Sequence, residues 1–147
     1  MIIWSIESGD KVHEPMTHHQ DCVCQQAYFA SVIDQSSQIC ALAYSPNGLY
    51  LATASDDGTV AIWNVATGGR MSNLPTMGHG GQYVRAVNWS PDSQRIVTAA
   101  LDNRIRLFDV ETGTPLGEPL TGHVNTPTVV AFRSSLLHHG LEVISGA

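Results

Sequence analysis

Short runs of alternating apolar and polar residues recur along the chain, and clusters of Pro, Asp, Asn, Ser and Gly separate them. The clearest set lies between Gly78 and Asp109, where runs that begin near Val84, Arg95 and Ile105 are broken by turn residues. Alternation with a period of two places successive side chains on opposite faces of a sheet, so runs of this length are typical of short antiparallel strands. The pattern therefore predicts an all-β chain.

Aromatic residues recur with the same spacing in two parts of the chain. Tyr44 lies nineteen residues before Trp63, and Trp89 lies nineteen residues before Phe108. A glycine follows five residues after Trp4, after Trp63 and after Phe108. The step from Trp63 to Phe108 gives a repeat of 45 residues. Repeats near this length, with four strands each, are typical of the blades of a β-propeller.

The motifs of these repeats resemble those of the WD-repeat family, in which each repeat runs from a Gly-His pair to a Trp-Asp pair. The matching segments are Gly78-His79, Gly122-His123, Ser45 to Gly48, Ser90 to Asp92 and Ser55 to Trp63. The departures are the terminal pairs, which are Trp4-Ser5, Trp63-Asn64 and Phe108-Asp109, and His18, which stands where Gly is expected. The resemblance implies antiparallel four-stranded blades and a surface that binds other proteins.

The resemblance also implies a hydrogen-bond chain inside each blade, from a turn Asp to the loop His, to a strand hydroxyl and to the Trp indole. The candidates are His19, Thr53 or Ser55, Asp57 and Trp63 in the first complete blade, and His79, Thr98, Asp102 and Phe108 in the second. Because Phe has no N–H donor, the second chain should stop one bond short. A buried imidazole left unpaired would cost about 1–3 kcal/mol, which favours a structural over a catalytic role for these histidines.

The order of the strands divides the chain into five segments. Residues 1–19 are expected to form the last two strands of a partial blade, 39–77 and 78–121 two full blades, and 122–147 the first two strands of a last partial blade. Residues 20–38 are extra, as a loop insertion or as an artefact of the gene model. A first strand could begin at Val23 or at Ile39, and Ile39 is preferred.

These strands amount to three blades, whereas propellers close with four to eight. The array is therefore expected to be incomplete, as an open arc or a fragment. A fragment or truncated member of a larger repeat protein is the preferred interpretation. The alternative is a homodimer, in which the strands at the start of one copy complete the last blade of another and two chains give six blades.

Composition and charge narrow the classes of partner. Thirteen acidic residues against seven basic ones give a net charge of −6, and the basic residues are scattered. Nucleic acid is therefore not expected as a partner, because phosphate binding needs a basic patch. No apolar run is long enough to span a bilayer, so no membrane contact is expected. The three bunched cysteines favour a reducing, cytoplasmic or nuclear compartment over secretion.

No catalytic motif or phosphate-binding loop occurs, so the sequence predicts neither an enzyme nor a bound cofactor. The expected function is a non-enzymatic scaffold for other proteins, and the candidate contact residues on turns are Arg85, Asp102, Asn103 and Arg104. The alternative is a metal-binding or enzyme-associated subunit of a signalling NTPase assembly. Its weak candidate ligands are His18, Cys22 and Cys24, and structural zinc usually takes a second pair of ligands.

Overall fold

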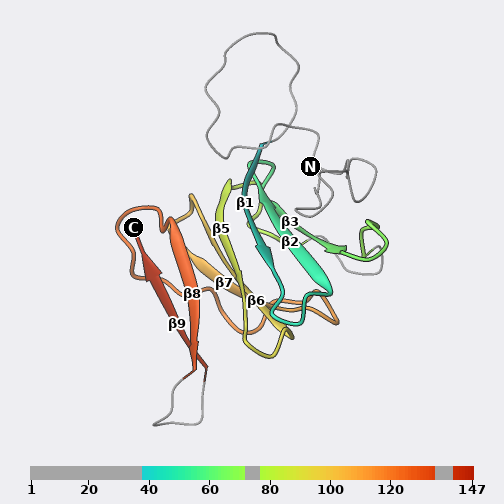
Figure 1. The fold of residues 1–147 in the computed structure, drawn as a ribbon. Coiled ribbons are helices and arrows are strands. Elements are labelled where there is room, and N and C mark those ends of the chain that lie inside the picture. Colours follow the sequence, from blue (N-terminus) through green and yellow to red (C-terminus); the bar gives the residue numbers. More distant parts are fainter. Residues whose placement is uncertain (1–37, 72–76, 135–140) are drawn as a thin grey trace, which may run out of the picture.

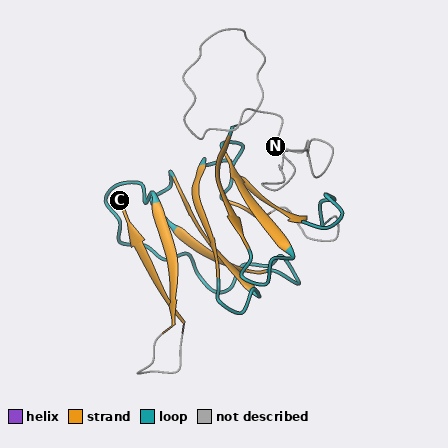
Figure 2. Cartoon of the chain, in the orientation of Figure 1, coloured by secondary structure: helices purple, strands orange, loops and turns teal. Residues whose placement is uncertain are grey.

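The computed structural model describes residues 38–71, 77–134 and 141–147 of the chain. All regular structure within these ranges is β, and Figure 2 shows no helix in them. None of the described residues therefore forms a helix that could cross a membrane. The strands are β1 (Ile39–Tyr44), β2 (Tyr50–Ser55), β3 (Thr59–Asn64), β4 (Met77–Gly78), β5 (Val84–Trp89), β6 (Arg95–Ala100), β7 (Ile105–Asp109), β8 (Val129–Ser134) and β9 (Leu141–Gly146).

The strands form three antiparallel sheets in chain order. The first sheet has the order β1-β2-β3-β4, the second β5-β6-β7 and the third β8-β9. Figure 1 shows the sheets side by side, with β9 at one end of the row. This arrangement confirms the predicted all-β class and the incomplete array of blades.

The fourth strand of each full blade is reduced to short pieces. In the first sheet, an isolated bridge joins Trp63 to Arg70, and the two residues of β4 then pair with the start of β3. In the second sheet only two isolated bridges remain, at Pro115 and at Leu120. Proline has no N–H to donate to a ladder, and a second proline, Pro119, precedes Leu120. The segment at the edge of the second sheet therefore pairs with β7 at isolated residues and does not form a continuous strand.

The core lies between neighbouring sheets, and alternate residues of one strand face different neighbours. Ile96 on β6 belongs to the apolar cluster shared with the first sheet, which includes Ala52, Trp89 and Phe108. Val97, the next residue, belongs to the cluster shared with Val130 of the third sheet. The middle sheet is thus apolar on both faces, which explains why β6 is buried from Ile96 to Ala100.

Two adjacent residues of β5 make hydrogen bonds to the neighbouring sheets. The indole Nε1 of Trp89 donates to the backbone carbonyl of Ala43 in the first sheet over 2.8 Å. On the other side, the Asn88 amide donates to the carbonyl of Val130 in the third sheet over 3.2 Å. Adjacent residues of β5 therefore hold the sheets on either side of it.

The turns between the first two strands of each full blade are built alike. The Ser45 hydroxyl accepts a hydrogen bond from the backbone N–H of Tyr50, and the Ser90 hydroxyl accepts one from that of Arg95, both over 2.9 Å. Both serine side chains are buried. The chain thus closes both turns with a buried hydroxyl that takes the place of a backbone acceptor.

At Gly58 the first sheet comes close to the linker that leads to the second sheet. Its φ of +82° lies in the left-handed region, and a Cβ added there would lie 2.8 Å from the backbone Cα of Gly81. Gly48 has a similar φ of +73°, but a Cβ there would meet no atom within 4 Å. Position 58 therefore requires glycine for space as well as for conformation.

Candidate functional site

The hydroxyl of Thr53 lies at the centre of the polar contacts inside the first sheet. The Trp63 indole Nε1 donates to Thr53 Oγ1 over 3.0 Å, and both side chains are buried. The Thr53 hydroxyl in turn donates to the backbone carbonyl of Ala61 over 3.4 Å. Threonine and tryptophan can meet in this way because β2 and β3 pair antiparallel with Thr53 opposite Ala61, two residues before Trp63.

The other candidates of the first blade lie in the turn after β2. The backbone N–H of Asp57 donates to the Ser55 hydroxyl over 3.3 Å. The Asp57 carboxylate accepts from the backbone N–H of Thr59 over 2.8 Å and from its hydroxyl over 2.6 Å. His19, the expected histidine of this blade, lies outside the described residues, so its role stays a prediction.

In the second sheet the structure brings His79, Thr98 and Asp102 together. Nε2 of the buried His79 lies 2.7 Å from the Thr98 hydroxyl, which donates to the carbonyl of Arg106 over 3.4 Å. Nδ1 of His79 lies 3.5 Å from the Asp102 carboxylate. Phe108, opposite Ile96, has no N–H with which to reach Thr98. The structural role expected for these residues stays a prediction.

Arg106, which was not among the residues expected from the sequence, joins this group. Its guanidinium donates to the Asp102 carboxylate over 2.6 Å and also contacts His79 Nδ1. The position lies opposite Thr98 in the register of β6 and β7, where the first blade has Ala61. The signal for Arg106 in the sequence was its position, four residues after Asp102 in the turn.

Burial and charge shift the acid–base behaviour of this group. Burial of the imidazole, reinforced by the Arg106 cation, lowers the pKa of His79 from 6.5 to about 4, and the Asp102 carboxylate opposes the shift only in part. Burial acts to raise the pKa of Asp102, but hydrogen bonds from Arg106 and from the Arg104 backbone outweigh it and lower that pKa. Near neutral pH, His79 is therefore neutral beside an Arg–Asp ion pair.

The third sheet repeats the contact between histidine and hydroxyl. His123 Nε2 lies 2.7 Å from the Ser145 hydroxyl, the same separation as between His79 and Thr98. The Gly-His motif here was evident in the sequence, whereas Ser145 was not among the expected residues. The register explains why Ser145 is equivalent to Thr98. Ser145 lies two residues after Val143, the partner of Phe132, and Thr98 lies two residues after Ile96, the partner of Trp89.

The candidate contact residues lie at one end of the second sheet. Arg85 Nη1 lies 3.6 Å from Cys40 Sγ and 3.8 Å from the Asp56 carboxylate, and its guanidinium lies 5.8 Å from the centre of the Tyr83 ring. The carboxylate of Asp102 lies in the neighbouring turn, within the group described above. Arg85 therefore connects the first two sheets and remains partly exposed.

The turn between β6 and β7 carries the other two candidates. The Asn103 amide donates to the carbonyl of Val124 over 3.1 Å, so this side chain holds the linker to the third sheet. Arg104 is exposed, and its backbone N–H donates to Asp102. Of these two residues, only Arg104 has its side chain largely available to a partner.

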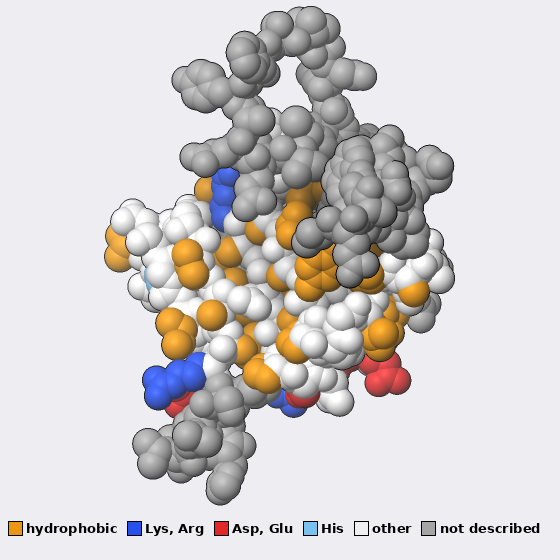
Figure 3. Space-filling model, in the orientation of Figure 1, with side chains coloured by type: hydrophobic (Ala, Val, Ile, Leu, Met, Phe, Trp, Pro, Cys, Tyr) orange, Lys and Arg blue, Asp and Glu red, His pale blue; other side chains and the backbone are white. Residues whose placement is uncertain are grey.

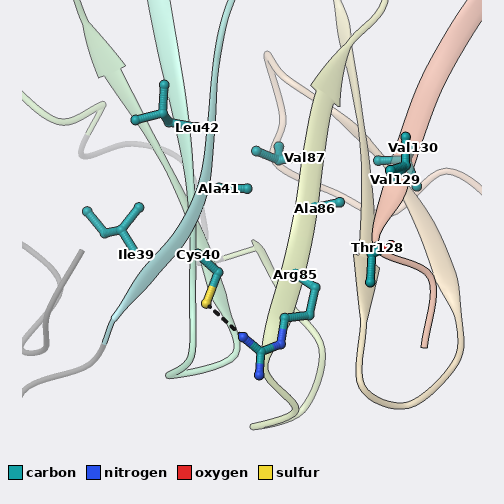
Figure 4. Close-up of a pocket in the computed structure, with 10 residues that line it drawn as sticks. All are labelled: Ile39, Cys40, Ala41, Leu42, Arg85, Ala86, Val87, Thr128, Val129 and Val130. Carbon is teal, nitrogen blue, oxygen red and sulfur yellow. Dashed lines mark hydrogen bonds between the residues drawn. The ribbon is translucent and has the colours of Figure 1, made fainter. Parts of the chain in front are cut away.

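A hollow of about 330 Å³ lies between the first strands of the three sheets. Figure 4 shows its lining residues on β1, β5 and β8, with Arg85 reaching toward Cys40. Most of its lining residues are apolar, among them Leu42, Val87 and Val129. The hollow thus brings side chains of all three sheets into one surface.

The candidate metal ligands cannot be placed in this arrangement. His18, Cys22 and Cys24 all lie outside the described residues. Within the described ranges, no three His, Cys, Asp or Glu residues gather closely enough to hold a metal ion. The metal-binding interpretation stays a prediction.

Comparison with known proteins adds to this geometry. The family described as "WD domain, G-beta repeat" matches residues 22–64 and 71–109, which together make up more than half of the chain. The chain belongs to the WD-repeat family. The first match begins at Cys22, inside the segment expected to be extra, whereas β1 begins at Ile39. Members of the WD-repeat family are generally non-enzymatic scaffolds.

Several curated WD-repeat relatives are similar to parts of this chain. The WD repeat-containing protein 26 homolog of Arabidopsis thaliana is 38% identical over 49% of the chain. The ribosome biogenesis protein BOP1 of Mus musculus is 35% identical over 64%, and echinoderm microtubule-associated protein-like 3 of Homo sapiens is 35% identical over 57%. The chain spans only 10–12% of the length of these relatives.

Proposed function

We propose that this WD-repeat chain is a non-enzymatic scaffold that binds other proteins through one end of its sheets. The observation that carries the proposal is a group of exposed side chains around Arg85. Tyr83 is 45% exposed and Leu101 38%, and the backbones of these two residues are joined by a hydrogen bond of 3.0 Å. Arg85 lies against the Tyr83 ring. We call Tyr83, Arg85 and Leu101 the contact patch.

The composition of the contact patch supports this role. Tyrosine and arginine are among the side chains most often responsible for binding energy at protein interfaces. The ring of Tyr83 and the guanidinium of Arg85 are already held against each other, so a partner would order few additional rotatable bonds. The patch adjoins the hollow, since Arg85 also lines it. A partner segment could therefore contact the patch and the hollow together.

The rest of the visible surface has a different character. Figure 3 shows apolar side chains scattered over one face, with few charged side chains, which lie toward its margins. The overall charge of −6 disfavours a polyanionic partner. A protein partner remains the class that fits best.

Affinity purification followed by mass spectrometry tests the proposal. The bait is the full chain, compared with a Tyr83→Ala/Arg85→Ala variant and with a control variant, Glu118→Ala, at an exposed position. Proteins retained by the wild type and by the control should be lost from the double variant. Equal retention by all three baits, or no protein retained above an empty bait, would refute the contact patch. Thermal melting of each bait shows whether the double variant is still folded.

We further propose an intracellular location and a place in a larger repeat array. The scarcity of cysteine favours a reducing compartment. The relative named as a ribosome biogenesis protein is in keeping with this proposal. The described residues form three sheets, fewer than a closed propeller needs, which supports a contribution of further blades from a longer polypeptide or from a second copy.

A further inference from the structure

The register of the three sheets makes their positions directly comparable. The first two strands pair Tyr44 with Leu51 in the first sheet, Trp89 with Ile96 in the second and Phe132 with Val143 in the third. Counted from these pairs, Ala52, Val97 and Ile144 occupy one position, and Ala41, Ala86 and Val129 another. Differences in exposure between equivalent positions therefore show where no neighbouring sheet of the described residues packs.

One end of the row has an exposed apolar face on the third sheet. Ile144 is 52% exposed, whereas Val97 and Ala52, at the same position, are fully buried against the following sheet. Val129 is 62% exposed, whereas its equivalent Ala86 is 7% exposed. We call Val129 and Ile144 the end face. In the other two sheets, the same positions contact the next sheet in the row.

The opposite end of the row has an exposed face on the first sheet. Tyr44 is 50% exposed and Leu42 is 42% exposed. Their equivalents in the second sheet, Trp89 and Val87, are only 3% and 7% exposed, because they pack on the first sheet. We call Leu42 and Tyr44 the front face.

The front and end faces are the two halves of one kind of contact. Inside the chain, each sheet presents the positions of the front face to the sheet before it and those of the end face to the sheet after it. The front face of one molecule should therefore fit the end face of another in the way that Trp89 and Val87 fit the first sheet. None of the four side chains is charged, so this packing would bury no unpaired charge.

The third sheet also has an edge available for a further strand. Among the described residues β9 pairs only with β8, whereas β2 and β6 each pair with a strand on both sides. The third strands of the other sheets place Trp63 opposite Leu51 and Phe108 opposite Ile96. A strand added to β9 would accordingly place an aromatic residue opposite Val143.

The sequence holds one further segment of this type. Trp4 precedes Gly9 by five residues, as Trp63 precedes Gly68, and Ile2 and Ile3 come directly before Trp4. These residues lie outside the described part of the chain. In the complete repeats, the chain passes from such a strand into the first strand of the following sheet. If this segment of a second molecule paired with β9, its chain would lead to that molecule's own β1, beside the end face.

We propose that the partner of the end face and of the β9 edge is a second copy of this chain. The front face of the second copy packs on Val129 and Ile144, and its segment 2–5 extends the third sheet with Trp4 opposite Val143. The same contacts in the reverse direction close a ring of six blades, a number that propellers adopt. This inference rests on the proposed scaffold function and names one partner for it.

Light scattering coupled to size-exclusion chromatography tests the assembly on the full chain. The chain mass is 15.8 kDa, and the wild type should elute as a single species of twice that mass. Ile144→Asp on the end face and Leu42→Lys on the front face should each reduce the mass to that of one chain. Mixing the two variants should restore the dimer, because one of its two contacts is then unmodified and the other pairs Asp with Lys.

The control is Val124→Asp, which makes the same kind of change at a residue 90% exposed in a loop outside both faces, and it should leave the dimer intact. A monomeric wild type, a larger open assembly, or an Ile144→Asp variant that stays dimeric would overturn the proposal. These results do not depend on the contact patch. Failure of the dimer is therefore distinguishable from failure of the scaffold function.

Disulfide trapping tests the strand register and distinguishes pairing with a second copy from pairing within one chain. Ala52 and Val97 lie directly opposite Ile62 and Leu107, so Ile3 is expected opposite Ile144. Directly opposed residues have Cα atoms close enough for a disulfide. An Ile3→Cys/Ile144→Cys variant should double in mass on oxidation under denaturing conditions, and each single variant should not. A disulfide within one chain, or no additional disulfide, would overturn the proposal.

Discussion

The uncharged state of His79 should make the stability of the chain sensitive to mild acid. The unfolded chain takes up a proton on this imidazole near pH 6.5, whereas the folded chain does so only near pH 4. Between these values the unfolded state binds more protons, so the stability is complete above pH 6.5 and falls as the pH is lowered. Burial of the ring, followed by the Arg106 cation, is the cause of the lowered pKa of His79.

The size of this effect follows from the two pKa values. At 1.36 kcal/mol for each pH unit, the loss at pH 5 relative to pH 7.5 is about 2 kcal/mol, and it levels off at about 3 kcal/mol near pH 4. For a chain of this length, a loss of about 2 kcal/mol lowers the melting temperature by roughly 4–8 °C. Asp102 titrates below this window because its pKa is lowered from 3.8.

Thermal or urea unfolding at several pH values from 7.5 to 4.5, at a fixed protein concentration, measures the effect. His79→Gln keeps a polar side chain beside Thr98 but does not titrate, so it should remove about 2 kcal/mol of the difference in stability between pH 7.5 and pH 5. His123→Gln is the matched control in the third sheet. Equal pH dependence in the wild type and in His79→Gln would refute the reasoning. Arg106→Leu supplies a second check, because removing the cation should raise the pKa of His79 and reduce the pH dependence.

The remaining predictions concern stability and are measured by urea unfolding near neutral pH. Trp63→Phe should cost about 1–3 kcal/mol, because it removes the indole N–H that bonds to Thr53, and an unchanged stability would contradict that role. Gly48→Ala should lower the free energy of unfolding by about 1–2 kcal/mol, because residue 48 has a left-handed backbone. Gly58→Ala should lower it by more, because the added Cβ would also meet backbone atoms. Equal losses for the two variants would show that position 58 has room for a side chain. Ser90→Ala should cost about 1–3 kcal/mol, because it leaves buried turn groups without their partner, and a cost near zero would exclude this.

The fold of the described residues could largely be predicted from the sequence. The alternation of side chains along the sequence predicted β5, β6 and β7. Each of these strands lies in a hairpin, and its successive side chains face the neighbouring sheets on opposite sides in turn. The structure also has β1 beginning at Ile39, the start that was preferred over Val23 in the sequence. These features depend on residues close together in the chain, which is why pattern and spacing were sufficient.

The fourth strands could not be predicted in the same detail. A full four-stranded blade was expected between residues 78 and 121, but its last part contributes only isolated bridges at Pro115 and Leu120. An edge strand is held by few partners, so a single residue without an N–H is enough to interrupt it. How far pairing continues there depends on neighbours across the sheet rather than on local alternation.

The candidate site was predicted in part. His79, Thr98 and Asp102 were proposed as one group from the family resemblance, and they do lie together. Arg106 was missed, because its approach to Asp102 and His79 depends on the pairing of β6 with β7, which brings it opposite Thr98. The pKa of His79 depends on this approach as well as on burial, so it could not be inferred from the motif alone.

The hydrogen bonds that Trp89 and Asn88 make to the sheets on either side determine how the chain should open. Each sheet that separates takes with it the acceptor of a side-chain donor on β5, so loss of an outer sheet weakens the middle sheet next. Stability in such a row depends on nearest neighbours, and opening should begin at the ends. In native-state hydrogen exchange, the amides of β5, β6 and β7 should therefore be the last to exchange among the described strands.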